Sequence, residues 1–451
     1  MTTYARRLGF FSATMAVVGG IIGGGIFRTP AAVAGPVGTP ALALGAWVLG
    51  GAIALVGALC FGELAQRRPR AGGGYVYLRD AWGLLPAFLY GWGLLLVIAT
   101  GAIAAVAVTF ADYAIALTGL AGQLTIPLAV GAIILLAGIN YLGVAPGAAT
   151  VNVLTVLKLG ALAALIVAGL GLALPAAAPS APAGDLLPAR SWLPALGAAL
   201  VPVLFTYGGW QQTNFIAEEI IEPERTLPRA LVAGVVIVVA VYLLANLAYL
   251  RVLGPEGLAR STAPAADTMR AVLGPAGGVF IAAGIAISTL GFLDLVILVT
   301  PRVLQAMAAD GVFLARLARL HPRYRTPSAA IVVEAAWAIV LTVTGTFAQL
   351  VDYVAFGDWI FFGLTVAGLY RLRARDAAAD LPSRPGFLVP GYPWTPGFFV
   401  AAALLVVVSS VLANPGNAAI GAALLLLGIP VYLWWRRPRL APTGGGEERS
   451  T

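Results

Sequence analysis

The chain has 451 residues, of which 60% are hydrophobic and only 10% carry a charge. A soluble domain of this length needs more polar residues to cover its surface, so the composition predicts an all-α integral membrane protein embedded in a lipid bilayer. The formal net charge is +8, but basic residues are not interleaved with aromatic ones in patches, so we expect no nucleic-acid binding.

Apolar runs of about 20 residues, the length that crosses a bilayer, predict twelve transmembrane helices. They cover approximately residues 8–35, 40–64, 81–111, 124–142, 149–174, 193–217, 228–252, 270–300, 327–345, 347–370, 394–413 and 416–435. A cleaved signal peptide is the alternative for the first run, which lacks a convincing cleavage site and leads into further spans. We therefore expect one transmembrane domain over residues 1–435 and a cytoplasmic tail over 436–451.

The distribution of basic residues predicts the orientation. With twelve spans, 21 of the 27 Lys and Arg residues fall on the side of the N-terminus and four on the opposite side. By the positive-inside rule, both the N- and C-termini are then cytoplasmic. We expect a multi-pass protein of the cell membrane, which in a bacterium is the inner membrane.

Two of these spans carry a glycine cluster at their centre, where each glycine weakens a helix by about 1 kcal/mol relative to alanine. The clusters lie in Gly19–Phe27 (GGIIGGGIF) and Phe205–Gln212 (FTYGGWQQ). Lipid cannot satisfy the backbone groups that a broken helix frees, so each break must line a polar cavity. Paired breaks indicate the substrate site of a secondary transporter. The alternative is that the glycines only allow close helix packing.

The breaks divide the chain into two similar halves, residues about 8–174 and about 193–370. Each half begins with a glycine-interrupted span and holds five spans. Because five is odd, the second half is inverted relative to the first. Two extra helices follow in residues about 394–435, and the Ala- and Pro-rich stretch Pro175–Ala189 is expected to link the halves on the outer side.

The residues around both breaks resemble a known family. Gly20–Pro30 (GIIGGGIFRTP) is similar to the first-span signature of the amino acid–polyamine–organocation superfamily. Phe205–Trp210 and Glu218–Ala230 together resemble its sixth-span signature, and the resemblance is to the L-amino acid transporter branch, which includes bacterial exchangers. Covering about residues 8–435, it implies a LeuT-like fold with a 5+5 inverted repeat that moves amino acids by alternating access.

An amino acid brings a carboxylate and an ammonium, and each is costly to bury unless it is matched. We expect backbone N–H groups of the first glycine cluster to bind the carboxylate at the positive end of a half-helix. Carbonyls freed in both breaks can take the ammonium. The predicted substrate-contacting residues are Ile21, Ile22, Gly23, Gly24, Gly25, Ile26, Phe205, Tyr207, Gly208, Trp210 and Gln211. The alternative for Trp210 is simple packing.

The resemblance adds roles for single residues. It implies that Phe205 closes over the substrate from outside, and that a serine is usual where this chain has Gly24. It also implies that Lys158, the only lysine, replaces the sodium ion of sodium-coupled relatives and ties span one to span eight. The alternative is that Lys158 snorkels to the cytoplasmic interface.

Three further polar residues within spans are candidates for gating or coupling: Ser288, Asp294 and Asp358. Related exchangers commonly carry asparagine near Asp294, which here either pairs with Lys158 or is protonated. Asp358 could favour a cationic substrate, serve as a proton site, or be a structural group. An ionisable residue inside a membrane is a functional candidate by default.

One histidine and one cysteine, Cys60, cannot assemble the usual zinc site or a Cys–His nucleophile, so we expect no metal, no cofactor and no enzymatic activity. The outer loop at about 112–123 lacks the cysteine that links the eukaryotic heteromeric branch to a glycoprotein, so no disulfide-linked partner is expected. The sequence thus favours sodium-independent exchange of neutral L-amino acids. Proton-coupled uptake, transport of cationic amino acids or polyamines, and a non-transporting amino acid sensor remain alternatives.

Overall fold

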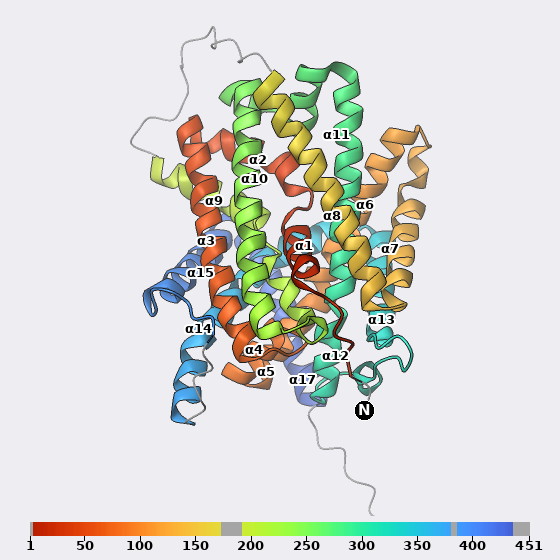
Figure 1. Ribbon diagram of the computed structural model, residues 1–451, viewed down its shortest axis with the longest axis vertical. Coiled ribbons are helices and arrows are strands. Elements are labelled where there is room, and N and C mark those ends of the chain that lie inside the picture. Colours follow the sequence, from red (N-terminus) through yellow and green to blue (C-terminus); the bar gives the residue numbers. More distant parts are fainter. Residues whose placement is uncertain (1–2, 173–191, 380–385, 436–451) are drawn as a thin grey trace, which may run out of the picture.

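The computed structural model describes residues 3–172, 192–379 and 386–435 as a bundle of helices (Figure 1). These residues form no β-strand, and their one isolated β-bridge joins Leu8 to Ile220. The all-α prediction is therefore confirmed. The predicted linker Pro175–Ala189 and the predicted tail 436–451 lie outside the described residues.

The helices follow one another with short connections. The first half contains α1 (Phe10–Ile21), α2 (Gly25–Val37), α3 (Pro40–Arg67), α4 (Gly74–Trp82), α5 (Leu84–Gly93), α6 (Ala99–Thr118), α7 (Thr125–Tyr141) and α8 (Val144–Val167). The rest contains α9 (Trp192–Thr206), η5 (Trp210–Glu219), α10 (Pro223–Arg260), α11 (Pro264–Val299), α12 (Pro301–Ala309), η6 (Ala315–Ala318), α13 (Ser328–Thr344), α14 (Phe347–Ala378), α15 (Trp394–Ala413), α16 (Pro415–Leu426) and α17 (Gly428–Trp435).

Eight helical stretches among the described residues are long and apolar enough to cross a membrane. The number rises to nine when α1 and α2, bent by 44° at a short break, count as one span. α13 has 17 residues and α9 has 15, so neither reaches the usual spanning length alone. A multi-pass membrane protein is supported, while the count of twelve spans and the inverted repeat stay predictions.

Two helices extend beyond their predicted ends because glycine bends them without ending them. α10 turns at Gly254 (φ 69°) and α11 at Gly274 (φ 66°). A proline follows each glycine, and proline suits the first turn of the helical segment that continues beyond the bend. The sequence predicted that the first of these helices ends at about 252 and that the second begins at about 270. Both predictions left out the extra turns, because charged residues interrupt the apolar runs there.

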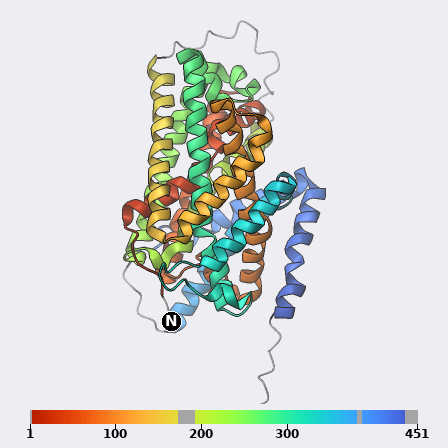
Figure 2. The same ribbon diagram turned by 90° about the vertical axis from the view of Figure 1, so that its right-hand side faces the viewer.

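The broken first span occupies the middle of the bundle (Figure 1). Residues Ala13–Ile21 of α1 are all buried, and α1 contacts α8, α10, α11 and η5. The last helices, α16 and α17, lie at one edge (Figure 2). We call the end of the bundle that carries residues 3–8, α4 and α12 the N-terminal face (Figure 1).

Candidate functional site

The two predicted helix breaks are present, and their backbones touch. A Cβ atom added to Gly20 would lie 2.8 Å from the carbonyl oxygen of Gly209, and one added to Gly209 would lie still closer to the carbonyl oxygen of Gly20. Gly209 also has φ 102°, a left-handed conformation that side chains disfavour. Glycine is therefore required on both sides of this crossing.

The start of α2 offers unpaired N–H groups. Among the described residues, the N–H groups of Gly24 and Gly25 donate to no acceptor, whereas that of Gly23 donates to the carbonyl of Ile21 at 3.0 Å. A Cβ on Gly24 would meet only a methyl group of Thr289, at 4.0 Å. Gly24 therefore faces open space at the positive end of α2, a position suited to an anion.

Gly25 differs from its neighbour because it packs tightly. A Cβ on Gly25 would lie 2.9 Å from the methyl carbon of Thr206 at the end of α9. The Thr206 hydroxyl lies 3.0 Å from that of Thr29 on α2, which ties α9 to α2. These two glycines thus have different surroundings: Gly24 borders open space, while Gly25 fixes how close α9 can lie.

The ammonium of Lys158 is bound at the C-terminal end of α1. Its Nζ donates to the carbonyl of Ile22 at 2.6 Å and to that of Gly19 at 3.0 Å, and the side chain is fully buried. A cation is favourable here because the last carbonyls of a helix form its negative end. The side chain points into the bundle, which is not the geometry of a lysine that snorkels to the interface.

Ser288 of α11 reaches the same break from another side. Its Oγ donates to the carbonyl of Gly23 at 2.9 Å and lies 3.4 Å from that of Ile22. Through Lys158 and Ser288, both α8 and α11 are therefore anchored to the freed carbonyls of the first span.

Tyr242 joins the two breaks and was missed by sequence reasoning. Its hydroxyl lies 3.1 Å from the carbonyl of Ile21 and 3.4 Å from that of Thr206. The sequence does contain a clue to this role: Tyr242 lies near the middle of an apolar span, where its hydroxyl needs a hydrogen-bond partner inside the protein. The predicted ammonium ligands at Ile21 and Ile22 therefore already accept bonds from protein donors.

Asp294 does not pair with Lys158. Its Oδ1 instead accepts a hydrogen bond of 2.6 Å from the Asn140 side chain on α7, and the other oxygen has no partner within the described part of the chain. Of the two possibilities raised by the sequence, the ion pair with Lys158 is wrong, because Asn140 of α7 faces this carboxyl group. Asp294 belongs to the contact between α7 and α11.

The side chains of the second break differ in how far they are exposed. Phe205 has 64% of its surface exposed and does not close over the break. Tyr207 is buried, edge-to-face with Trp47 at 5.7 Å between ring centroids. The side-chain oxygen of Gln211 folds back to accept from the N–H of Gly209 at 3.1 Å. Of these three side chains, only that of Phe205 is exposed.

Trp210 packs within an aromatic cluster. Its ring lies 4.9 Å from Phe61 and 6.1 Å from Phe362, measured between centroids. This geometry is the one expected if Trp210 only packs against other side chains and does not contact the substrate. Phe362 is one turn after Asp358 on α14, so α14 lies against the second break. Asp358 itself forms no hydrogen bond or ion pair with any other residue that the structure describes.

A buried ion pair lies on the N-terminal face. Arg302 of α12 binds both carboxylate oxygens of Glu219 at 3.0 Å, and both side chains are almost entirely buried. The backbone N–H groups of Arg7 and Leu8 donate to the carbonyl of Glu219 at 2.9 and 3.0 Å. The chain start is thereby held against the end of η5. Sequence reasoning missed this pair because 83 residues separate its members.

Comparison with known proteins shows the family of the chain. A family profile described as Amino acid permease matches residues 8–434. The human b(0,+)-type amino acid transporter 1 is 31% identical over 393 residues, which cover 86% of this chain and 80% of the transporter. The human Large neutral amino acids transporter small subunit 2 is 31% identical over 463 aligned positions, with coverages of 96% and 82%. The Serine/threonine exchanger SteT of Bacillus subtilis (strain 168) is 31% identical over 432 residues, with coverages of 95% and 96%. All three names describe transporters or exchangers and none describes an enzyme.

Proposed function

Because the chain belongs to the amino acid permease family, we propose that it is a secondary transporter that exchanges neutral L-amino acids by alternating access, without sodium. Among the relatives, one is named for large neutral amino acids and another as a serine/threonine exchanger. Those names support exchange and a neutral substrate here.

The observation that carries the proposal is the position of the Lys158 ammonium. Its two bonds, to Ile22 and Gly19, satisfy carbonyls that a broken helix leaves inside the membrane. A sodium ion placed there would need these same oxygens. The protein supplies its own cation at the end of α1, and this supports transport without sodium.

The substrate groups have separate candidate ligands. The unpaired N–H groups of Gly24 and Gly25 are suited to the carboxylate, beside the open space at Gly24. Tyr242 and Lys158 already bond to the carbonyls of Ile21 and Ile22. In the second break the carbonyls of Phe205 and Thr206 accept from Gly208 and Tyr242, so the ammonium is left mainly to the carbonyl of Tyr207. Phe205 would then cover the substrate, and its exposed ring corresponds to an open lid.

The neutral side chain follows from the charges around the breaks. Among the described residues, Lys158 is the one basic or acidic side chain bonded to either break, and its ammonium already binds two carbonyls. A substrate with an anionic side chain would have no cationic partner bonded to the breaks, and a buried unpaired charge is costly. Asp358 is an acid on α14, which lies against the second break, so the test below includes arginine as a substrate.

Proton-coupled uptake is the second candidate, because several acidic groups in the apolar helices have no cation partner among the described residues, including Asp294, Asp358 and the buried Glu334. Asp294 has one buried oxygen without a partner, and Asp358 forms no ion pair with the described residues. Protonation of any of these groups during the cycle would couple substrate movement to a proton gradient.

We further propose that the protein lies in the cell membrane with both termini in the cytoplasm, as the positive-inside rule indicates. It would work without a disulfide-linked partner, since its single cysteine, Cys60, is buried in α3. The N-terminal face, with its buried Glu219–Arg302 pair, would then be the closed cytoplasmic side.

The test is uptake of labelled amino acids by purified protein in proteoliposomes. Vesicles are preloaded with serine, leucine, arginine or buffer alone, in sodium or choline chloride, with and without a pH gradient. The proposal expects uptake of neutral amino acids that requires an internal neutral amino acid and is equal in sodium and choline. Uptake into empty vesicles driven by a pH gradient would favour the proton-coupled candidate, and a strict need for sodium would contradict both.

A further inference from the structure

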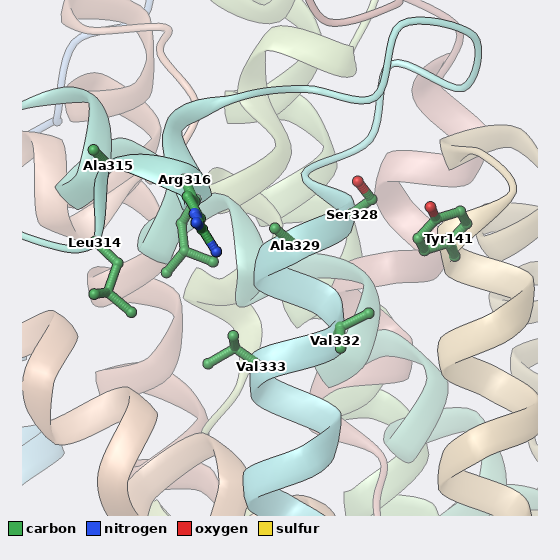
Figure 3. Close-up of a pocket in the computed structure, with 9 residues that line it drawn as sticks. Tyr141, Leu314, Ala315, Arg316, Ser328, Ala329, Val332 and Val333 are labelled. Carbon is green, nitrogen blue, oxygen red and sulfur yellow. The ribbon is translucent and has the colours of Figure 1, made fainter.

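A cavity of about 830 Å³, lined by no residue of either helix break, lies on the N-terminal face. Figure 3 shows it in close-up. It is bounded by the end of α7, the start of α13 and the loop that contains η6. One wall is apolar and includes Ala329, Val332 and Val333 of α13. Figure 3 shows the side chain of Arg316 above this wall, between the loop and α13. The cavity therefore combines an apolar surface with one guanidinium group.

The helices that border the cavity face outward from the bundle. Val332 has 56% of its surface exposed, and Leu135 on α7 has 61%. Such apolar surfaces on two neighbouring apolar helices are suited to lipid tails. Because the cavity lies where α7 ends at Tyr141 and α13 begins at Ser328, it is at the depth where acyl chains give way to lipid headgroups.

The loop above the cavity is strongly basic. Residues 311–327 contain four arginines and no Asp or Glu. The acid just before this stretch, Asp310, pairs with Arg79 at 2.8 Å. Among the described residues, no carboxylate lies within 4 Å of the Arg316 guanidinium. Arg316 thus presents an uncompensated positive charge at the membrane surface.

Internal bonds hold this loop in place. The Gln305 side chain donates to the carbonyl of Ala318 at 3.0 Å, which fixes η6 to α12. The Thr326 hydroxyl donates to the carbonyl of Tyr141 at 3.0 Å, which fixes the loop to α7. His321 Nδ1 accepts two backbone N–H groups of the loop, each at 3.2 Å. The loop backbone that carries Arg316 is therefore held in place by the fold.

We propose that this cavity binds one anionic phospholipid. The Arg316 guanidinium would bind the phosphate, because its planar donors match phosphate oxygens in pairs. An acyl chain would lie along Val332 and Val333. The apolar wall is what selects a lipid over free phosphate, since a small anion cannot use that surface. Basic pockets at helix ends on one membrane side are suited to anionic headgroups in this way.

The experiment measures lipid binding by native mass spectrometry of the purified full-length protein. Wild type, Arg316→Gln and Arg323→Gln are titrated with phosphatidylglycerol and with phosphatidylcholine of the same acyl chains. Arg323 is the matched control because it lies in the same loop and the charge change is equal, but it does not line the cavity. We expect wild type and Arg323→Gln to bind one phosphatidylglycerol, and Arg316→Gln to bind it about tenfold more weakly.

Two outcomes would overturn the proposal: equal weakening in both variants, which indicates diffuse charge attraction, or unchanged binding in Arg316→Gln. A second variant, Ala329→Trp, fills the cavity without changing charge and should also lose the lipid. Displacement of the lipid by millimolar inorganic phosphate would show a free-anion site instead. Thermal unfolding of each variant, compared with wild type, confirms that the loss of binding is not a loss of folding.

Discussion

The backbones of Gly20 and Gly209 cross so closely that neither residue can carry a side chain. A Cβ on Gly20 would lie 2.8 Å from the Gly209 carbonyl oxygen, and the reverse contact is closer. The two glycine clusters are about 180 residues apart in the sequence but form one structural unit. The backbone of each break limits which residues the other break can contain.

Gly209→Ala should damage both folding and transport. The left-handed conformation alone costs a non-glycine residue about 1–2 kcal/mol, and the clash with Gly20 adds to it. We expect a lower unfolding temperature in detergent and loss of amino acid exchange. Gly197→Ala on α9, where no atom lies within 4 Å of the added carbon, is the control and should behave as wild type. Normal exchange by the Gly209→Ala protein would contradict the close backbone contact between Gly20 and Gly209.

Gly24→Ser and Gly25→Ser should differ sharply. A side chain on Gly24 enters open space, whereas one on Gly25 collides with Thr206. We expect Gly24→Ser to keep most of the exchange activity, and Gly25→Ser to lose it. Uptake of labelled substrate, normalised to protein inserted in the vesicles, checks both variants. Equal activity in the two would remove the distinction between open and packed glycines.

Lys158→Ala should slow exchange more than it weakens substrate binding. The change leaves the carbonyls of Gly19 and Ile22 without their donor, and each buried unsatisfied group costs about 1–3 kcal/mol. We expect exchange at least about tenfold slower, because 1.4 kcal/mol corresponds to tenfold. Equilibrium binding of labelled substrate should change less.

The control for Lys158 is Thr150→Ala on the same helix. Its hydroxyl bonds only to the carbonyl of Pro146 in its own helix and is exposed. Thr150→Ala should exchange substrate normally. Wild-type flux in the Lys158→Ala protein would show that this lysine is not needed for transport and has only a structural role.

Phe205→Ala should impair exchange without affecting stability. Because 64% of the Phe205 surface is exposed, removing the ring creates no cavity. We expect exchange to fall by about tenfold, equivalent to about 1.4 kcal/mol in activation free energy. Phe398→Ala on α15, also exposed at 47%, serves as control and should be active. An undiminished rate for Phe205→Ala would exclude the ring as a lid.

Arg302→Met should destabilise the protein strongly, because it leaves the Glu219 carboxylate buried without a partner. Breaking a buried ion pair from one side typically costs about 3–5 kcal/mol. The double variant Arg302→Met with Glu219→Gln removes both charges and should recover part of the unfolding temperature. If the single and double variants unfold at the same temperature, the pair is not coupled in the way that its 3.0 Å geometry indicates.

Local sequence patterns were enough to predict the breaks. Glycine lowers helix stability wherever it occurs, so Gly23–Gly25 and Gly208–Gly209 could be recognised without tertiary information. Lys158 could be singled out because a charge inside an apolar run is unusual. The all-α fold followed from composition and run length alone.

Partners across the bundle could not be predicted in the same way. Asn140 binds Asp294 from 154 residues away, and Tyr242 reaches Ile21 from 221 residues away. Which helix faces which is decided by packing of the whole chain, and apolar periodicity is weak in helices that are apolar on all sides. The ends of α10 and α11 were missed for a local reason, the glycine bends that let a helix continue.

The burial of Cys60 has a practical consequence for studying this protein. It is the only thiol in the chain and lies fully inside α3, so a membrane-impermeant maleimide should leave the wild-type protein unlabelled. A cysteine introduced at any exposed position then becomes a unique attachment point for a dye or spin label. Paired labels across the N-terminal face could report its opening directly, and single labels would report which side of the membrane that face occupies.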